Sequence, residues 1–271
     1  TKAGYLQNIF GRPPASQLAD PNFWRIPSWG VYDIPYSIPN VETGYVEVEA
    51  PIPNGPWRAV FSPGSTFARE CFFDEVAHAM RHDPLAFRLD LPAEGRTLQL
   101  GGLAINQKRL ANVLRLSGER AGWGKPLPKG WGRGIAANVY DGDTYITYVV
   151  EASVEGGRVR AHRVVCVADP GTVVNPSGAE AQIEGGMLFG LSTALCGEIT
   201  MRKGRVEQSN FGDYPVVRMG EAPRVENILA PPGDPPAALR EPPVSPIPPA
   251  LANAVFAATG KRLRGMPFRL E

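Results

Sequence analysis

The spacing of apolar residues predicts three helices in the first half of the chain. The first covers residues 65–79, where apolar residues recur on one face and Ser65 or Thr66 can act as the cap. The second is a short helix over residues 83–89 with proline at its first position. The third is an amphipathic helix over residues 107–119. Strict alternation of small apolar residues with glutamate predicts a half-buried strand over residues 45–50.

Alternation dominates the second half and predicts an antiparallel meander with one face against a core. Its three strands are expected over residues 132–138, 144–154 and 158–168, and the first two join across Asp141-Gly142, a dipeptide typical of hairpins. The remaining predicted elements are helices from residue 179 and over 250–259, a hairpin around Lys203-Gly204, and a last strand over 225–230.

Together these elements predict an α+β protein. We expect two mixed α/β subdomains with largely antiparallel sheets and packed helices. The boundary is placed near residue 128, where glycine, proline and tryptophan form a linker-like stretch. The first subdomain would cover residues 1–128 and the second residues 129–271.

Composition narrows the class of protein. The 271 residues are 43% hydrophobic and 20% charged, and the net charge of +1 gives no electrostatic footprint for nucleic acid. No apolar run reaches the roughly 20 residues that a transmembrane helix needs. The three cysteines form no CxxC pair, which argues against an iron–sulfur cluster or a zinc finger within this chain.

Two further signals lead to weaker hypotheses. His78 and His82 are spaced as in zinc-binding helices, but the glutamate of such proteases and a third ligand are missing, so no metal site is predicted. Thr1 invites comparison with N-terminal-nucleophile hydrolases, yet no strand follows it into a cleft. A chain that begins without methionine or a signal peptide is instead expected to be a piece of something longer, and a cytoplasmic or periplasmic location stays open.

A proline-rich stretch holds the strongest candidate for chemistry. Residues 231–249 are dense in proline, which fixes φ and removes backbone donors, so this segment is expected to form a rigid track. Glu241 lies in its middle, directly after Arg240, and a helix follows. Such a track can present a carboxylate as a base. A solvated Glu–Arg pair on a surface loop is the alternative interpretation.

A second candidate lies in the helix expected from residue 179. Gln182, Gly185, Gly186 and Gly190 recur at helical spacing and leave one face nearly bare. Each interior glycine costs about 1 kcal/mol relative to alanine, so a bare face calls for a reason. It admits another backbone or a flat ligand at close range, and tight packing against a sheet would explain the glycines almost as well.

Three motifs carry a family resemblance. They are Arg240-Glu241-Pro242-Pro243 with its following helix, the run D-x-G-x-x-V-N-P-x(5)-Q-I-E-G over residues 169–185, and E-C-F-F-D-E-V-A over 70–77 with D-P-L-A-F-R after it. These motifs resemble the molybdopterin-binding large subunit of the xanthine oxidase family of molybdenum hydroxylases, in the branch of isoquinoline 1-oxidoreductase and aldehyde dehydrogenase. The similarity covers nearly the whole chain and implies the C-terminal part of such a subunit.

The resemblance implies roles at the cofactor. Glu241 would act as general base, and Gln182 would hydrogen-bond the pterin, because an amide offers a donor and an acceptor together. Gly185, Gly186 and Arg240 would also lie at the cofactor. The chain departs from the family at Arg240, where a glycine is usual, and an arginine there can crowd the site or pair with Glu241.

Arg58, Trp57 and Phe61 would face the substrate. A guanidinium can clamp a carbonyl or carboxylate, and an aromatic ring can stack on a flat one. For Arg58, an ion pair at the surface is the alternative. Either an aldehyde or an aromatic N-heterocycle fits these three side chains.

The implied activity is hydroxylation of such a substrate with water as the oxygen source. The cofactor would be molybdenum–molybdopterin in its cytosine dinucleotide form, with no protein ligand to the metal. A small partner subunit would hold the [2Fe-2S] clusters, and a second partner would be the N-terminal half of the molybdopterin subunit. The alternative is a non-catalytic or cofactor-free scaffold half that only assembles with its partner chain.

Overall fold

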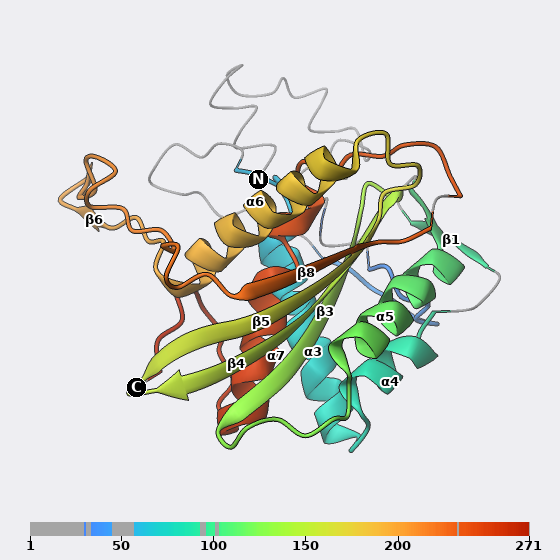
Figure 1. Cartoon of the computed structure of the whole chain (residues 1–271), viewed down its shortest axis with the longest axis horizontal. Helices are drawn as coiled ribbons and strands as arrows, with labels where there is room; N and C mark the ends of the chain where they lie inside the picture. Colours follow the sequence, from blue (N-terminus) through green and yellow to red (C-terminus); the bar gives the residue numbers. More distant parts are fainter. Residues whose placement is uncertain are drawn as a thin grey trace.

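A long three-stranded meander forms the centre of the fold (Figure 1). The computed structural model describes residues 30, 34–44, 57–92, 96–100, 103–231 and 233–270. The central sheet has the order β3 (Trp131–Tyr140), β4 (Thr144–Glu155), β5 (Arg158–Asp169), β8 (Arg224–Leu229). The meander is antiparallel, whereas β8 runs parallel to β5. The predicted α+β class and these four strands are confirmed, and the strand predicted over residues 45–50 lies outside the described residues.

Helices cover both faces of this sheet, and short hairpins lie at its margins (Figure 1). The helices are α3 (Ser62–Ala79), α4 (Pro84–Asp90), α5 (Gln107–Ala121), α6 (Pro176–Leu195) and α7 (Ile247–Thr259), with a 3-10 turn η2 (Pro242–Val244) before α7. The hairpins are β1 (Thr97–Leu100) with β2 (Leu103–Asn106), and β6 (Met201–Arg202) with β7 (Arg205–Val206). The predicted hairpin around Lys203-Gly204 is therefore confirmed.

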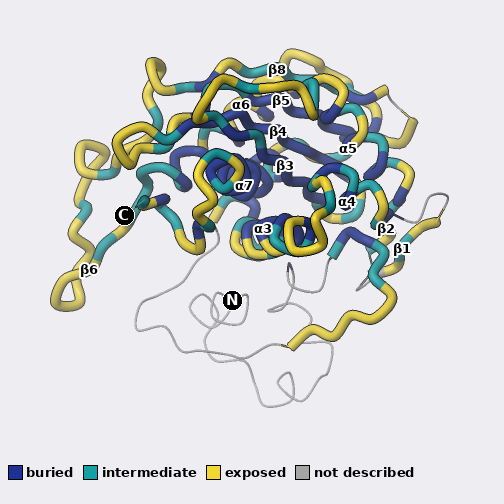
Figure 2. Tube along the Cα trace, turned by 90° about the horizontal axis from the view of Figure 1, so that it is seen from below, coloured by how far each residue is buried: buried dark blue, intermediate teal, exposed yellow. Residues whose placement is uncertain are grey.

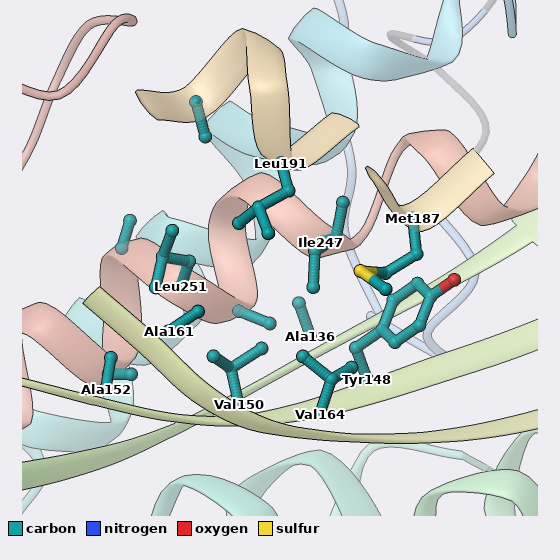
Figure 3. Close-up of a cluster of buried hydrophobic side chains, with 14 of the residues drawn as sticks. Ala136, Tyr148, Val150, Ala152, Ala161, Val164, Met187, Leu191, Ile247 and Leu251 are labelled. Carbon is teal, nitrogen blue, oxygen red and sulfur yellow. The ribbon is translucent and has the colours of Figure 1, made fainter. Parts of the chain in front are cut away.

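The side chains of β4 divide between two cores. Ile146, Tyr148 and Val150 enter the cluster formed with α6 and α7 (Figure 3), and Tyr145 and Val149 enter the cluster formed with α4 and α5. Figure 2 shows long buried stretches in β3, β4 and β5, whereas β8 at the edge of the sheet is only partly buried. The prediction that one face of the meander packs against a core is wrong, because both faces of β4 are apolar and both are covered.

The proposed boundary at residue 128 falls between elements that share a core. Phe73 of α3 and Leu114 of α5 lie in one buried cluster with Ile135 and Val165 of the central sheet. Helices from before the boundary thus cover strands from after it. The division into subdomains 1–128 and 129–271 stays a prediction.

Three predicted helix starts are too late, and α6 begins at Pro176 rather than near residue 179. Helix α3 begins at Ser62, with Phe61 as an N-cap that makes no side-chain cap bond, so Ser65 and Thr66 do not cap it. Helix α7 begins at Ile247, earlier than expected. In both helices proline occupies the first turn, where the backbone N–H groups have no partner within the helix and a missing donor costs little.

A buried carboxylate ties α3 to its neighbours. Glu70 receives a hydrogen bond from Arg88 Nε at 2.9 Å, from the Tyr36 hydroxyl at 3.1 Å and from the Ala137 amide of β3 at 3.2 Å. Both charges of the Glu70–Arg88 pair are fully buried, so each needs the other. Glu70 therefore serves the fold rather than a substrate, as its place in the helix suggests.

Helix α7 lies unusually close to β3. A Cβ atom on Gly132 would lie 2.1 Å from the Ala254 carbonyl oxygen, and one on Gly134 would lie 2.2 Å from the Ala254 nitrogen. Only glycine permits this approach. The buried Asn253 side chain donates to the Ile135 carbonyl oxygen at 3.1 Å and completes the contact.

This contact predicts that Gly134→Ala destabilises the protein by about 3 kcal/mol, because the added methyl group overlaps helix backbone that cannot move aside. The control is Gly64→Ala in α3, where a Cβ meets no described atom within 4 Å. That change should be neutral or should stabilise by up to about 1 kcal/mol. Urea-induced unfolding of the two variants measures the difference, and equal stabilities would contradict the close contact.

Candidate active site

The proline-rich track is fastened along one end of the central sheet. Thr172 donates from its amide and its hydroxyl to the Asp234 carbonyl oxygen, each at 2.9 Å. Further along, the Ala237 amide donates to the Pro170 carbonyl oxygen at 2.8 Å, and the Thr144 hydroxyl donates to the Ala238 carbonyl oxygen at 2.9 Å. The segment leading to Glu241 is therefore held by bonds to its own backbone as well as stiffened by proline.

The glycine of the D-x-G motif makes room for this track. Gly171 has φ +70°, and a Cβ there would lie 2.1 Å from the Pro235 carbonyl oxygen. Later in the motif, Asn175 caps α6 by accepting a hydrogen bond from the Gly178 amide at 3.1 Å, and Pro176 begins the helix. These motif residues shape backbone, and only the helix that follows carries side chains toward the site.

Arg109 anchors the same track through its charge. Its guanidinium donates to both carboxylate oxygens of Asp169 at 2.8 Å, lies 3.0 Å from the Asp234 carboxylate, and stacks over the Tyr145 ring at 4.3 Å. Sequence reasoning missed this residue. The signal was weak, since Arg109 appears only as one of several basic residues in an amphipathic helix.

The bare face of α6 receives the turn that follows Glu241. A Cβ on Gly186 would lie 2.7 Å from the Pro243 Cβ, and one on Gly190 would lie 2.5 Å from the Val244 carbonyl oxygen. Another backbone therefore occupies this part of the face. Gly185 differs, because a Cβ there would meet no described atom within 4 Å. The glycines thus divide into two that admit the η2 turn and one that lines open space.

Arg58 joins the α6 helix to the proline-rich track. Its Nε donates to the Arg240 carbonyl oxygen at 2.7 Å, and its Nη2 donates to the same oxygen and, at 3.1 Å, to Gln182 Oε1. A guanidinium has no acceptor, so the Gln182 oxygen must face Arg58. The Gln182 amide nitrogen, with its two donors, then points elsewhere.

A strained turn presents Arg58. The next two residues, Ala59 and Val60, have φ values of 72° and 38°, which residues other than glycine rarely adopt. Hydrogen bonds from the Val60 amide to the Trp57 carbonyl oxygen at 2.8 Å, and from the Ser62 amide to the Ala59 carbonyl oxygen at 2.9 Å, hold this conformation. Strain of this kind, of order 1–3 kcal/mol per residue, persists where the surroundings fix it, often at functional sites.

Two aromatic rings lie beside the Arg58 clamp. Trp57 and Phe189 of α6 have ring centroids 4.7 Å apart with an interplanar angle of 31°, and the Arg58 guanidinium carbon is 6.0 Å from the Phe189 centroid. Trp57 is 37% exposed and Phe189 39%, so both rings keep open surface. Phe61 has a structural position at the start of α3, where its carbonyl oxygen accepts the Ser65 hydroxyl at 3.0 Å.

Glu241 is mostly buried, with 20% of its side chain exposed. The Tyr140 hydroxyl, at the end of β3, donates to Glu241 Oε2. Burial and then this hydrogen bond raise the pKa of Tyr140 far above its ordinary value, so the phenol remains a donor. Arg240 Nε lies 3.8 Å from Glu241 Oε1, but the Arg240 side chain is 79% exposed and extends into solvent.

Most of the predicted site residues lie close to one another in the structure. The structure brings together Glu241, Arg240, Arg58 and Gln182, and it places Trp57 beside them through Phe189. Gly186 contributes packing, and Gly185 contributes open surface. Sequence reasoning missed Tyr140 and Phe189: Tyr140 precedes the Asp141-Gly142 turn without any motif, and Phe189 reads as one more apolar helix residue.

The His78–His82 pair serves packing and charge. His78 meets the Phe256 ring edge-on at a centroid distance of 5.0 Å, and His82 Nε2 lies 2.9 Å from an Asp90 carboxylate oxygen. Within the described ranges, no group of three or more His, Cys, Asp or Glu side chains is arranged to hold a metal ion. Of the helices described, none has the length and apolar character needed to cross a bilayer.

Comparison with known families identifies the stretch of chain that contains α6. Residues 131–223 match the family model of a molybdopterin cofactor-binding domain. That range holds β3, the D-x-G motif, α6 and Gln182. The predicted resemblance to the molybdopterin-binding subunits of the xanthine oxidase family of molybdenum hydroxylases is confirmed.

Curated relatives agree on the family and are much longer. The chain is 30% identical over 257 residues to the isoquinoline 1-oxidoreductase subunit beta of Brevundimonas diminuta, covering 94% of this chain and 31% of that protein. It is 36% identical over 226 residues to a membrane-bound aldehyde dehydrogenase of Gluconacetobacter polyoxogenes that is named for pyrroloquinoline quinone, covering 79% and 29%. The chain thus spans less than a third of either relative.

Solved structures agree on the fold. Aldehyde oxidoreductase from Desulfovibrio desulfuricans superposes with a TM-score of 0.64 at 16% identity, over 78% of this chain and 40% of that one. Quinoline 2-oxidoreductase from Pseudomonas putida superposes with a TM-score of 0.61 at 13% identity, over 77% and 50%. The predicted architecture, that of the molybdopterin-binding domains of this family, is confirmed.

The two kinds of glycine in α6 give a matched test. Gly190→Ala should displace the η2 turn and lower stability by about 2–3 kcal/mol, because its methyl group overlaps the Val244 carbonyl oxygen. Gly185→Ala should stabilise the isolated chain by up to about 1 kcal/mol, since its methyl group enters open space on an exposed helix. Thermal unfolding of both variants decides, and a Gly190→Ala variant as stable as the unmodified chain would contradict the packing described.

Proposed function

We propose that this chain supplies the proton-accepting side of a molybdenum-cofactor-dependent oxidoreductase that hydroxylates an aldehyde or an aromatic N-heterocycle with oxygen from water. One observation carries the proposal. The Arg58 guanidinium bonds both to Gln182, on the helix whose motif marks cofactor contact, and to the carbonyl group directly before Glu241. A cofactor-facing amide and a carboxylate base are thereby held at one place.

The surface around Gln182 suits a flat heterocycle such as molybdopterin. Arg58 fixes the amide so that its NH₂ group is offered to a ligand, which must then present an acceptor. Gly185, next along this face, leaves backbone open to close approach. The proposed form of the cofactor is the cytosine dinucleotide. Gly186 acts indirectly, because it lets the η2 turn pack against α6. Arg240 contributes its carbonyl group to the Arg58 clamp and its guanidinium to an ion pair with Glu241.

The residues of the chain handle the proton. When bound, a molybdenum cofactor supplies the centre at which oxygen transfer and electron uptake take place. Glu241 acts as general base toward that centre, a role worth roughly 10²–10⁴-fold in rate. Its mostly buried position limits competing solvation, and the fastened track fixes its distance from Gln182.

Substrate would meet the aromatic side of the clamp. The exposed faces of Trp57 and Phe189 offer stacking surface to a planar substrate. Arg58 Nη1, which has no hydrogen-bond partner among the described residues, is placed to meet a carbonyl or ring nitrogen. Phe61, the N-cap residue of α3, is the third residue proposed to face the substrate.

The partners are an iron–sulfur small subunit and the N-terminal part of the molybdopterin subunit, because the chain spans less than a third of its relatives. The chain alone is expected to be inactive. The scaffold alternative rests on Arg240 in place of the family's usual glycine and on the family's first Gly-Gln-Gly cofactor segment, which does not occur in this sequence. The Arg240 side chain is 79% exposed and its Nε lies 3.8 Å from Glu241 Oε1, so it approaches the carboxylate from the solvent side.

The proposal predicts that Glu241→Gln abolishes turnover in the assembled complex, by at least about 10²-fold, while melting temperature and assembly are kept. Glutamine preserves the size of the side chain and removes its basicity. Steady-state oxidation of an aldehyde and of an N-heterocycle, with an artificial electron acceptor, measures the effect. Turnover equal to that of the unmodified complex would remove Glu241 from its role.

Cofactor content tests the proposal independently of activity. The assembled complex should contain molybdenum and a pterin dinucleotide in equal amounts, measured by metal analysis and by chromatography of the released pterin. A complex that assembles without molybdenum would support the scaffold alternative. Recovery of pyrroloquinoline quinone instead would support the cofactor for which the Gluconacetobacter relative is named.

A further inference from the structure

We propose that Tyr140 is a positioning residue for Glu241, which it orients so that one named carboxylate oxygen, Oε1, accepts the proton. The inference rests on the proposed function, since it assigns a helper to the proposed base. Its ground is geometric: the Tyr140 hydroxyl donates to Glu241 Oε2, and this bond joins the end of β3 to a residue far along the chain.

Tyr140 stands on a rigid support. It is the last residue of β3 and pairs with Thr144 across the tight turn at Asp141-Gly142, where φ is 52° and 81°. The Thr144 hydroxyl holds the Ala238 carbonyl oxygen of the proline-rich track at 2.9 Å. One hairpin end therefore fixes both the phenol and the segment that carries the carboxylate, so their separation is set by a sheet rather than by loops.

The bond divides the two oxygens of Glu241. Oε2 is occupied by the phenol, which leaves Oε1 to accept a proton. The charged groups that face this pair are Arg240, whose Nε lies 3.8 Å from Oε1, and Asp141 beside Tyr140. Arg58 lies behind, on the Arg240 carbonyl oxygen. The bond from Tyr140 therefore restricts rotation of the Glu241 carboxylate and leaves Oε1 as the oxygen that faces the reacting proton.

Another tyrosine of the same hairpin shows what a purely structural role looks like. The Tyr145 hydroxyl donates to the Gly142 carbonyl oxygen at 3.0 Å and accepts from the Asn106 amide at 2.6 Å. These are backbone partners that hold the turn to β2. Tyr145→Phe is therefore the matched control, because it removes one phenol hydroxyl from the same hairpin without touching Glu241.

In the assembled, cofactor-loaded complex, Tyr140→Phe should lower kcat roughly tenfold and leave KM nearly unchanged. The loss arises because a carboxylate without this bond rotates freely, so that Oε1 is less often aligned with the reacting proton. Tyr145→Phe should lower the melting temperature and leave kcat nearly unchanged. An unchanged kcat in Tyr140→Phe would overturn the proposal.

A second measurement needs no cofactor. With ¹³C-labelled tyrosine in the full chain, the Tyr140 ring resonance, assigned by its loss in Tyr140→Phe, can be followed against pH. Glu241→Gln should lower the pKa of Tyr140, because the charge that opposes phenolate is gone. A Tyr140 pKa that is the same in the unmodified chain and in Glu241→Gln would contradict the contact between Tyr140 and Glu241. If Glu241→Gln retains turnover, the proposed function fails; if only the Tyr140 results fail, the proposed function stands.

Discussion

The contact between the bare face of α6 and the η2 turn is the constraint on which the site depends. Gly186 and Gly190 let Pro243 and Val244 lie directly against the helix. Glu241 immediately precedes that turn, so the place of the carboxylate follows from how closely two backbones approach. Larger side chains in place of Gly186 and Gly190 would push the η2 turn outward and move Glu241 with it.

Polar contacts then hold in place the site residues that this packing brings close together. Arg58 spans from Gln182 to the Arg240 carbonyl oxygen, and Tyr140 fixes one oxygen of Glu241. Both act on a track already fastened to the ends of β4 and β5 through Thr144 and the D-x-G motif. Because each support comes from a different element, the carboxylate is held from several directions, as a base of fixed geometry requires.

Much of the fold follows from periodicity, because the central strands are long and strongly patterned and their turns carry Asp-Gly and Gly-Gly. Helix starts are less accessible. A proline can replace a capping side chain, as at the starts of α3 and α7, and Ser65 and Thr66 then mislead. The second covered face of β4 was also missed, since alternation alone does not reveal what packs against the other side.

At the site, sequence predicts residues better than their partners. Motifs point to Glu241 and Gln182, but no motif shows that Arg58 links their two segments. Arg58 lies 124 positions before Gln182 and 182 positions before Arg240 in the sequence. Of the two expectations for Arg240, the structure shows the pairing with Glu241, with Arg240 Nε 3.8 Å from Glu241 Oε1 and the arginine side chain 79% exposed. Tyr140 carries no local signal at all, and only the folded hairpin brings it to the carboxylate.

Locating the metal would test the central claim most directly. Anomalous scattering at the molybdenum edge from crystals of the assembled complex gives its position without assumption about the pterin. The account predicts a peak on the Gln182 side of α6, with a ligand of the metal within hydrogen-bond reach of Glu241 Oε1. A molybdenum peak remote from that oxygen, with Glu241 still bonded to Tyr140, would contradict it.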